Sequence, residues 1–200
     1  MTAQITDHIL FDGQRFSLAS EPLAAWLDRR KNRQLRFYRA STACSRGYGA
    51  AWEVARGRLY LTKFVARLVD GTPASIETLF ANYTDQFYAS VNVQAPANEG
   101  PGRFAFWFTG MLRCPMGKQL AYRHYGYGSI FERELCLCFQ DGRLIGSRIV
   151  DNLPLSEKNL RLVRRLQSHL IDEDLVTDED IEEKVLERQI RRHWASLTWP

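Results

Sequence analysis

Residues 46–68 read RGYGAAWEVARGRLYLTKFVARL and set a pattern that recurs along the chain. From Trp52 to Leu61, large apolar side chains alternate with polar or small ones, which is the period of a half-buried β-strand. Arg56-Gly57 interrupts the alternation where a tight hairpin turn needs residues at positive φ. The stretch therefore predicts two antiparallel strands joined by a two-residue turn.

The same signals predict further strands and turns. Asp12-Gly13 divides 8–18 and Asp141-Gly142 follows 129–139, and both dipeptides are typical of type I′ hairpin turns. Other strand patterns cover 34–40, 83–93, 104–113, 121–127 and 144–150, while 21–30 and 72–80 carry helix-start signals. We expect an α+β fold: an antiparallel twisted sheet or partly closed β-barrel, with flanking helices and a C-terminal helical hairpin.

The character of the chain changes after residue 150. Residues 1–150 hold 19 Lys/Arg and 12 Asp/Glu, a net charge of +7, whereas 151–200 have a net charge of −3. Apolar residues at helical spacing over 156–170 and 178–194 predict two helices. We expect a β-rich core domain over 1–150 and a helical extension over 151–200, either packed on the core or projecting from it.

Composition narrows the class of protein. No apolar run approaches the ~18–20 residues of a membrane span, and the N-terminus has no signal-peptide pattern, so we expect a cytoplasmic protein. The four cysteines are then reduced. Cys136 and Cys138 lie on one face of a strand as C-x-C, which falls short of the four ligands of tetrahedral zinc. We expect buried structural thiols, and no metal or cofactor.

A partial internal echo links two parts of the chain. Gly47-Tyr48-Gly49-x-x-Trp52-Glu53 matches Gly126-Tyr127-Gly128-x-x-Phe131-Glu132, and each copy is followed by a Gly-Arg-Leu turn. Two copies do not make a repeat array. The echo indicates either two hairpins related by pseudo-symmetry or chance reuse of hairpin sequences.

Two residue pairs are candidates for catalysis. Cys44, in a loop of small residues, would need His124 as its base. Glu53 and Glu132 occupy equivalent places in the echo and would face one cleft if the hairpins were pseudo-symmetric. Simpler interpretations are a buried thiol and carboxylates paired with arginines such as Arg46 or Arg133. No sequence motif of a known catalytic site is present.

Nucleic-acid binding is a further alternative. The sequence beginning at Arg46 matches the opening of the RNA-binding strand of RNA-recognition motifs, but Ala50 and Glu53 stand where stacking aromatic residues are needed. The basic core and four tyrosines still favour some nucleic-acid contact. These tyrosines are Tyr48, Tyr122, Tyr125 and Tyr127.

Several motifs resemble an uncharacterised family of bacterial cytosolic proteins. They are Ala43-Cys44-x-Arg46-Gly47-Tyr48-x-Ala50-x-Trp52-Glu53, then Leu59-Tyr60-Leu61, Trp107-Phe108-x-Gly110-x-Leu112-Arg113 and Gly126-Tyr127-Gly128-Ser129-Ile130-Phe131-Glu132. The likeness covers about 8–150, and Ser45 departs from it where a bulkier residue is expected. The resemblance implies small proteins that accompany secreted toxins, but it brings no known activity, cofactor or catalytic residue.

We therefore expect a non-enzymatic binding protein, of the immunity or antitoxin type, that neutralises a toxin by protein–protein contact. The acidic segment 172–183 would resemble an anionic substrate in a basic toxin cleft. Its predicted partner-binding residues are Asp172, Glu173, Asp174, Asp178, Glu179, Asp180, Glu182 and Glu183. A small enzyme and a nucleic-acid-binding protein are the alternatives.

Overall fold

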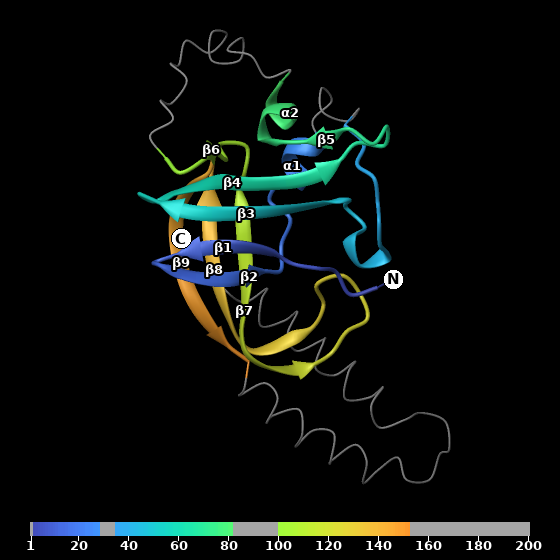
Figure 1. The fold of residues 1–200 in the computed structure, drawn as a ribbon. Coiled ribbons are helices and arrows are strands. Elements are labelled where there is room, and N and C mark those ends of the chain that lie inside the picture. The colour runs from blue at the N-terminus through green and yellow to red at the C-terminus, as the bar shows by residue number, and fades with distance from the viewer. Residues whose placement is uncertain (1, 29–34, 82–99, 153–200) are drawn as a thin grey trace, which may run out of the picture.

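The computed structural model describes residues 2–28, 35–81 and 100–152, and nine strands lie in one mixed sheet (Figure 1). The strands are β1 (Asp7–Phe11), β2 (Gln14–Leu18), β3 (Tyr48–Ala55), β4 (Arg58–Arg67), β5 (Pro73–Ala74), β6 (Arg103–Phe104), β7 (Gly110–Ala121), β8 (Ile130–Gln140) and β9 (Arg143–Asp151). Neighbouring strands follow the order β2-β1-β3-β4-β9-β8-β7, and β5 and β6 also pair with β4.

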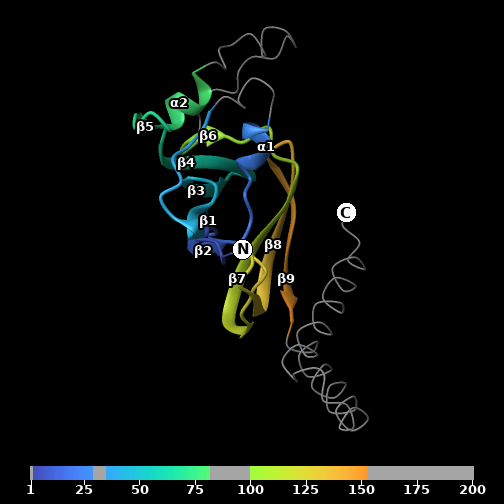
Figure 2. The same cartoon turned by 90° about the vertical axis from the view of Figure 1, so that its right-hand side faces the viewer.

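The sheet folds over on itself into two layers. In Figure 1 the strands β1 to β4 run across the direction of β7 to β9, and Figure 2 shows the two layers from the side. Side chains from both inner faces meet between them and form the core, as in orthogonally packed sheets. The core includes Ile9, Leu18, Trp52, Leu59, Leu61, Leu112, Cys114, Leu135, Leu137 and Phe139.

Two features of this sheet correct the predicted fold class. The strands are not all antiparallel, because β1 lies parallel to β3 with Ile9 opposite Trp52. The sheet is also not closed into a barrel among the described residues, since β2 and β7 are the two ends of its path. Just beyond β2, the Ala19 amide donates to the Arg113 carbonyl of β7 at 2.8 Å, so the two layers touch there without a continuous strand pair.

The three predicted hairpin turns are confirmed. Their first residues adopt positive φ although they are not glycine: 47° at Asp12, 51° at Arg56 and 47° at Asp141. A glycine with φ between 67° and 73° follows each one. This is the type I′ geometry, whose twist matches that of the flanking strands.

The two echoed hairpins meet at their turns. Arg58 stands opposite Arg143 in the short contact between β4 and β9. The Leu59 amide donates to the Gly142 carbonyl at 2.9 Å, and the Leu144 amide donates to the Gly57 carbonyl at 2.8 Å. Because equivalent atoms of each Gly-Arg-Leu turn exchange these bonds, the echo is locally pseudo-symmetric at this corner.

The aromatic run 104–113 is not the single strand that its pattern predicts. β6 ends at Phe104 and β7 begins at Gly110, and the residues between them turn. Trp107 points inward and its indole nitrogen donates to the Pro22 carbonyl at 3.1 Å. With Trp26 and Phe80, whose rings lie 4.7 Å apart, Trp107 forms an aromatic cluster inside the protein.

Two further predictions need correction. Residues 35–40 form only an isolated bridge, between Phe37 and Leu68. Residues 110–121 form one long strand that continues through Pro115, so the separate strand expected over 121–127 is absent. The availability of a partner strand explains both outcomes. β7 pairs with β8 along most of its length, whereas residues 35–40 have almost no partner.

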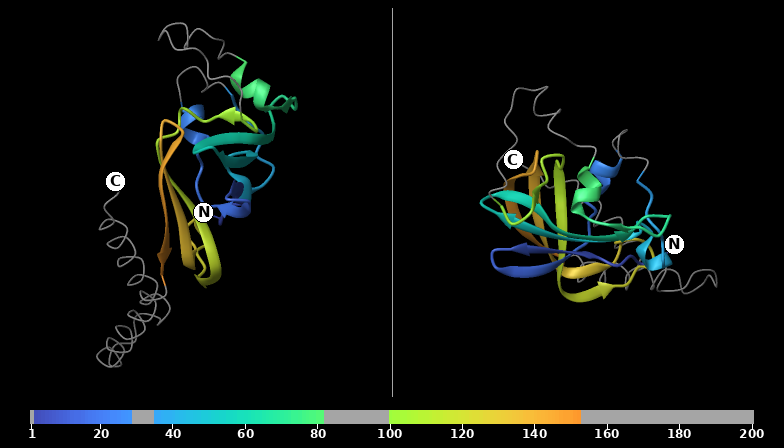
Figure 3. Two further views of the ribbon diagram at one scale, coloured as in Figure 1. Left: turned by 90° about the vertical axis from the view of Figure 1, so that its left-hand side faces the viewer. Right: turned by 45° about the horizontal axis from the view of Figure 1, so that its top comes forward.

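Helices are few and short. They are α1 (Ala24–Leu27), the 3₁₀ turn η1 (Thr42–Cys44) and α2 (Ile76–Phe80), and Figure 3 shows α1 and α2 at one end of the sheet. The helix predicted over 72–80 begins later than its sequence signal: Ser75 caps α2 and forms a capping box with Thr78. No helix in the described ranges is long and apolar enough to cross a membrane. The predicted strand over 83–93 and the helices over 151–200 lie outside the described residues.

Candidate functional site

A buried ion pair lies where the two echoed motifs come together. Arg46 precedes β3, and its guanidinium Nη2 lies 2.7 Å from Asp7 Oδ1 at the start of β1. The two side chains are 5% and 1% exposed, so water screens their attraction very little. Each charge therefore depends on the other, because an unpaired charge in this environment is strongly unfavourable.

Arg46 also joins distant segments of the chain. Its Nη1 donates to the Ile5 carbonyl at 2.7 Å and to the Tyr127 hydroxyl, which belongs to the second echoed motif. The Tyr127 hydroxyl in turn donates to Glu21 at 3.1 Å. One guanidinium thus connects the N-terminal segment, the entry to β3, and the connection between β7 and β8.

Asp7 organises the start of β3. Its carboxylate accepts hydrogen bonds from the Ala50 amide at 2.9 Å and from the Trp52 indole at 3.4 Å, in addition to the contact with Arg46. Arg46, Ala50 and Trp52 are all part of the motif that carries the family resemblance. Burial raises the pKa of Asp7, and Arg46 and the two N–H donors oppose that rise.

The tyrosines in this network stay neutral. Burial raises the pKa of Tyr127 well above its usual value, and the neighbouring Glu21 raises it further, against the opposing charge of Arg46. Burial, Glu21 and Asp7 likewise raise the pKa of Tyr48. Both phenols therefore stay protonated and are neutral hydrogen-bonding groups at physiological pH.

Two hollows flank this network, which we call the Arg46 cluster (Asp7, Glu21, Arg46, Tyr48 and Tyr127). The first, the tyrosine cleft, has a volume of about 680 Å³. It is lined by Thr2, Gln4, Glu21, Arg39, Ser41, Thr42, Ser45, Tyr125, Gly126 and Tyr127. The second, the arginine pocket, has a volume of about 670 Å³. It is lined by Glu21, Ala24, Leu27, Asp28, Leu35, Arg36, Phe37, Arg39, Arg46, Tyr48 and Val69.

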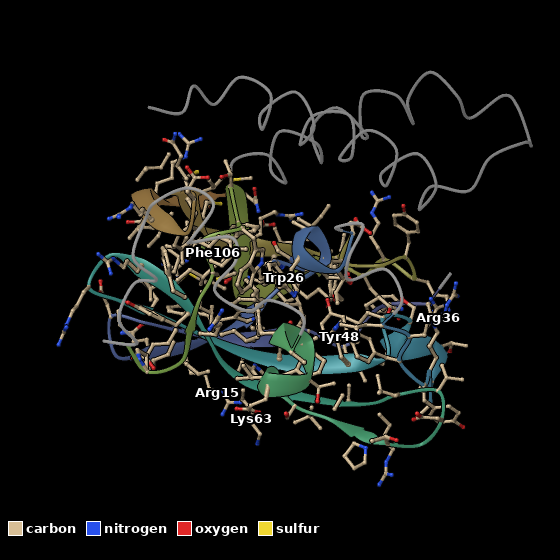
Figure 4. The ribbon with its side chains drawn as sticks, turned by 90° about the horizontal axis from the view of Figure 1, so that it is seen from above. Arg15, Trp26, Arg36, Tyr48, Lys63 and Phe106 are labelled. Carbon is tan, nitrogen blue, oxygen red and sulfur yellow. The ribbon has the colours of Figure 1, made fainter. Side chains whose placement is uncertain are left out.

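The two hollows are neighbours. Glu21 and Arg39 line both of them, so together they follow one side of the molecule. Figure 4 shows Tyr48 in the interior and Arg36 toward the edge on the same side. Residues from the N-terminal segment, the 35–46 segment and the loop after β7 therefore make a continuous surface that sequence order alone would not group.

The structure does not join Cys44 to His124. The Cys44 thiol donates to the Tyr48 carbonyl at 3.3 Å, four residues along the chain. The His124 ring instead forms a hydrogen bond with the Tyr122 hydroxyl at 3.1 Å. Since each group has a different partner and they share no contact, this pair does not form a nucleophile–base arrangement.

Glu53 and Glu132 do not face one cleft either. Glu53 lies three residues before its hairpin turn, whereas Glu132 lies nine residues before the corresponding turn. At about 3.3 Å per residue, the additional six residues add about 20 Å along β8. The pseudo-symmetry holds at the turns and is lost before it reaches the carboxylates. Glu132 instead accepts from the Lys118 amide at 3.0 Å.

The tyrosines and cysteines separate into surface and interior groups. Tyr122 and Tyr125 are 60% and 59% exposed, as expected for surface contacts, but Tyr48 is buried and is therefore not available for the predicted contact with nucleic acid. Cys114, Cys136 and Cys138 are buried and reduced, which confirms structural thiols, while Cys44 is half-buried. The acidic segment 172–183 lies outside the described residues.

A second buried ion pair lies elsewhere in the sheet. Arg113 of β7 donates to both carboxylate oxygens of Glu134 on β8, at 2.7 and 2.8 Å. Glu134 is 1% exposed. Neither Asp7 nor the Arg113–Glu134 pair was predicted from the sequence. The only signal for Asp7 was Arg46 itself, since a motif arginine next to a buried strand needs an acid that the sequence does not identify.

Comparison of the chain with protein-family models, curated proteins and solved structures gives no match. The resemblance to a bacterial cytosolic family stays a prediction. The candidate site therefore depends on its own geometry: a buried polar network with two neighbouring hollows beside it.

Proposed function

We propose that this protein is a non-enzymatic binding protein of the bacterial cytoplasm that neutralises a toxin-type protein by direct contact. The observation that carries the proposal is the tyrosine cleft, which exposed Tyr125 and Arg39 line together with Glu21 and Tyr127 of the Arg46 cluster. Tyrosine and arginine are enriched where proteins bind each other. A floor held by buried hydrogen bonds loses little conformational freedom on binding.

The chemistry of the cleft suits a segment of polypeptide. Hydroxyl groups of Ser41, Thr42 and Ser45 line it together with Gln4, and these groups both donate and accept hydrogen bonds. A peptide backbone presents alternating donors and acceptors, which such a lining satisfies. The acidic segment 172–183 is proposed as a second contact, directed at a basic cleft on the toxin.

A pull-down from the native host cytosol with the full chain tests the proposal. We expect one stoichiometric protein partner, and we expect Tyr125→Ala to reduce its capture at least tenfold, since aromatic anchors contribute about 2 kcal/mol or more. Tyr122→Ala is the matched control because Tyr122 is equally exposed and does not line the cleft. Equal capture by both variants would refute the role of the cleft.

The acidic segment needs its own variant. Replacing Asp172, Glu173 and Asp174 by Asn, Gln and Asn keeps the side-chain size and removes three charges. We expect slower association with the partner and a smaller effect of salt on the association rate. The amides have no charge, so they no longer attract a basic partner from a distance. An unchanged rate at low salt would remove this segment from the proposal.

Nucleic-acid binding is the second candidate, and one observation favours it. Arg39 and the exposed Tyr125 line the same cleft, and Tyr38 is 58% exposed beside Arg39 in the chain. Cations next to exposed aromatic rings are the elements of a single-strand binding groove. Retention of nucleic acid that is released as salt rises would favour this candidate over the protein partner.

A further inference from the structure

Strand β9 has one open edge. It pairs with β8 along its whole length, but it meets β4 only at its first residue, where Arg143 stands opposite Arg58. Beyond that corner β4 pairs with β6 and then with β5 instead. Figure 1 shows β9 at the rim of its layer. Along 145–151, the side of β9 that faces away from β8 therefore has no partner strand among the described residues.

The hydrogen-bond pattern shows which backbone groups point toward this edge. The Asn152 amide donates to the Glu132 carbonyl at 2.8 Å, at the position just after Asp151. In an antiparallel ladder, a residue flanked in this way exchanges no bonds with the residue opposite it, and such residues alternate with bonded ones. Ser147 and Ile149 belong to the same unbonded series. Their N–H and C=O groups thus point away from β8, and they form no backbone hydrogen bond within the described ranges.

The open edge lacks the features that usually keep edges from pairing. Ile149 is 56% exposed, and Ser147 is exposed and uncharged. β9 contains no proline and no lysine, the residues with which many proteins protect an open edge. Its one irregularity is at Ile145, which has no opposite residue because the β8–β9 register shifts there. The regular part of the open edge begins after this bulge and includes Ser147 and Ile149.

A second copy of the chain fits the open edge in one register. Symmetric antiparallel pairs centre on residue 147, 148 or 149. Centring on Ser147 would place Ile149 opposite the irregular Ile145. Centring on Arg148 would place two arginines directly opposite each other, which is unfavourable. Centring on Ile149 avoids both problems: the two Ile149 side chains meet at the symmetry axis, and Ser147 of each copy stands opposite Asp151 of the other.

We propose that two copies of the chain pair through β9, antiparallel and centred on Ile149, and join their sheets into one. Each copy offers the same edge, so every contact forms twice, as in a closed two-fold dimer. Both Ile149 side chains leave water, and the Ser147 hydroxyl donates to the carboxylate opposite it. Ile149 lies six residues from the corner with β4, or about 20 Å along the strand, so β4 does not obstruct the second copy. The proposal uses no residue of the tyrosine cleft and does not depend on the proposed protein partner.

Sedimentation of the full chain tests the pairing. An edge-to-edge contact of this length buries less than the ~1,200–2,000 Å² of a stable interface, so we expect a reversible dimer with a dissociation constant on the order of 10 µM. The average mass should therefore rise from that of one chain toward that of two between about 1 and 200 µM. A chain that stays monomeric over this range would overturn the proposal, whether its own residues 153–200 or a different protein cover the edge.

One variant acts on the side chain at the axis. Ile149→Lys should raise the dissociation constant at least tenfold, because it places two like charges opposite each other. Val65→Lys is the matched control, since Val65 is also a β-branched residue on a strand and is 57% exposed, but lies on β4 and faces β3. Equal weakening of the dimer by both variants, or by neither, would overturn the proposal.

A second variant acts on the backbone. Ser147→Pro removes an outward N–H and keeps the bonds between β9 and β8, and edge strands tolerate proline at such positions. We expect a weaker dimer and a thermal unfolding midpoint close to that of the native chain, both measured well below the dissociation constant. A folded Ser147→Pro chain that dimerises like the native chain would refute the backbone pairing. Ile149→Lys decides the question if Ser147→Pro does not fold.

Disulfide cross-linking tests the register. The Cα atoms of a bonded antiparallel pair are about 5.5 Å apart, which is within the range of a disulfide. Under oxidising conditions Ile149→Cys should form a covalent dimer, and Ser147→Cys should form much less of it. The native chain, with its half-buried Cys44, measures the background. Equal yields from the two variants, or more from Ser147→Cys, would overturn pairing centred on Ile149.

Discussion

The two buried ion pairs have the same closest distance and different roles. Asp7–Arg46 and Glu134–Arg113 both approach to 2.7 Å. Arg113 and Glu134 lie on adjacent strands of one hairpin and form two parallel hydrogen bonds, so their pair fixes the local register of β7 and β8. Arg46 binds groups from segments that are far apart in sequence, so its pair assembles the candidate site.

Exposure separates the two pairs as well. The Arg113 side chain is 31% exposed, whereas that of Arg46 is 5% exposed. Water can replace part of a lost contact at Arg113 but almost none at Arg46. The same chemistry therefore stabilises a sheet in one place and joins the segments of the candidate site in another.

The largest effect is expected from Arg46→Gln, which leaves Asp7 buried without a countercharge. Breaking a buried pair from one side costs about 3–5 kcal/mol, and we expect a loss of that size in the free energy of unfolding measured with urea. A loss below about 1 kcal/mol would contradict the role given to this pair.

The same variant has a predicted pH dependence. Burial already raises the pKa of Asp7 above 3.8, and loss of Arg46 removes an opposing effect, so the pKa rises further. A folded state that binds this proton more tightly than the unfolded state becomes less stable as pH rises from about 4 through the folded pKa. The deficit of Arg46→Gln relative to the native chain should therefore shrink between pH 7 and pH 4.

Gly47→Ala tests whether the position of Arg46 is set by its neighbour. Gly47 has φ of 74°, and an added Cβ would lie 2.9 Å from the Phe37 Cβ. We expect a loss of about 2–3 kcal/mol in unfolding free energy from strain and crowding. Gly49→Ala is the control, because Gly49 has open space around it and should change stability by less than about 0.5 kcal/mol. Equal effects at both glycines would contradict this explanation.

Glu134→Gln should lower the free energy of unfolding by less than Arg46→Gln or Gly47→Ala does. The amide keeps one acceptor for Arg113, and the partly exposed guanidinium regains water, so we expect about 1–2 kcal/mol in urea unfolding. Hydrogen exchange should speed up along β7 and β8 and stay unchanged around β1 and β3. Faster exchange at β1 would show that this pair also supports the Arg46 cluster.

In the native protein, a thiol reagent should hardly modify the cysteines near the Arg113–Glu134 pair. Burial raises the pKa of Cys114 and of Cys136 to about 12, so neither forms a thiolate at pH 8. We expect Ellman's reagent to modify half-buried Cys44 first, and all four cysteines only after unfolding. Rapid modification of three thiols in the native protein would contradict the packing around Glu134.

Part of the fold follows from local rules. The turns at Asp12-Gly13, Arg56-Gly57 and Asp141-Gly142 were predictable because positive φ is a requirement that a dipeptide carries by itself. The aromatic residues at 104–108 were wrongly assigned to one strand, because alternation does not reveal where a chain bends. The candidate site was partly visible: Arg46 and Tyr127 lay in recognised motifs, while their acidic partners did not.

The sequence by itself determined the hairpins, the alternation of buried and exposed faces, and the division of charge between 1–150 and 151–200. These depend on neighbours in the chain, whose preferences can be read locally. Tertiary structure alone decided that β1 lies parallel to β3, that Arg46 meets Asp7 and Tyr127, and that two hollows share Arg39. Those contacts join residues distant in sequence, and their partners are selected by burial and charge in the folded protein, which no local pattern records.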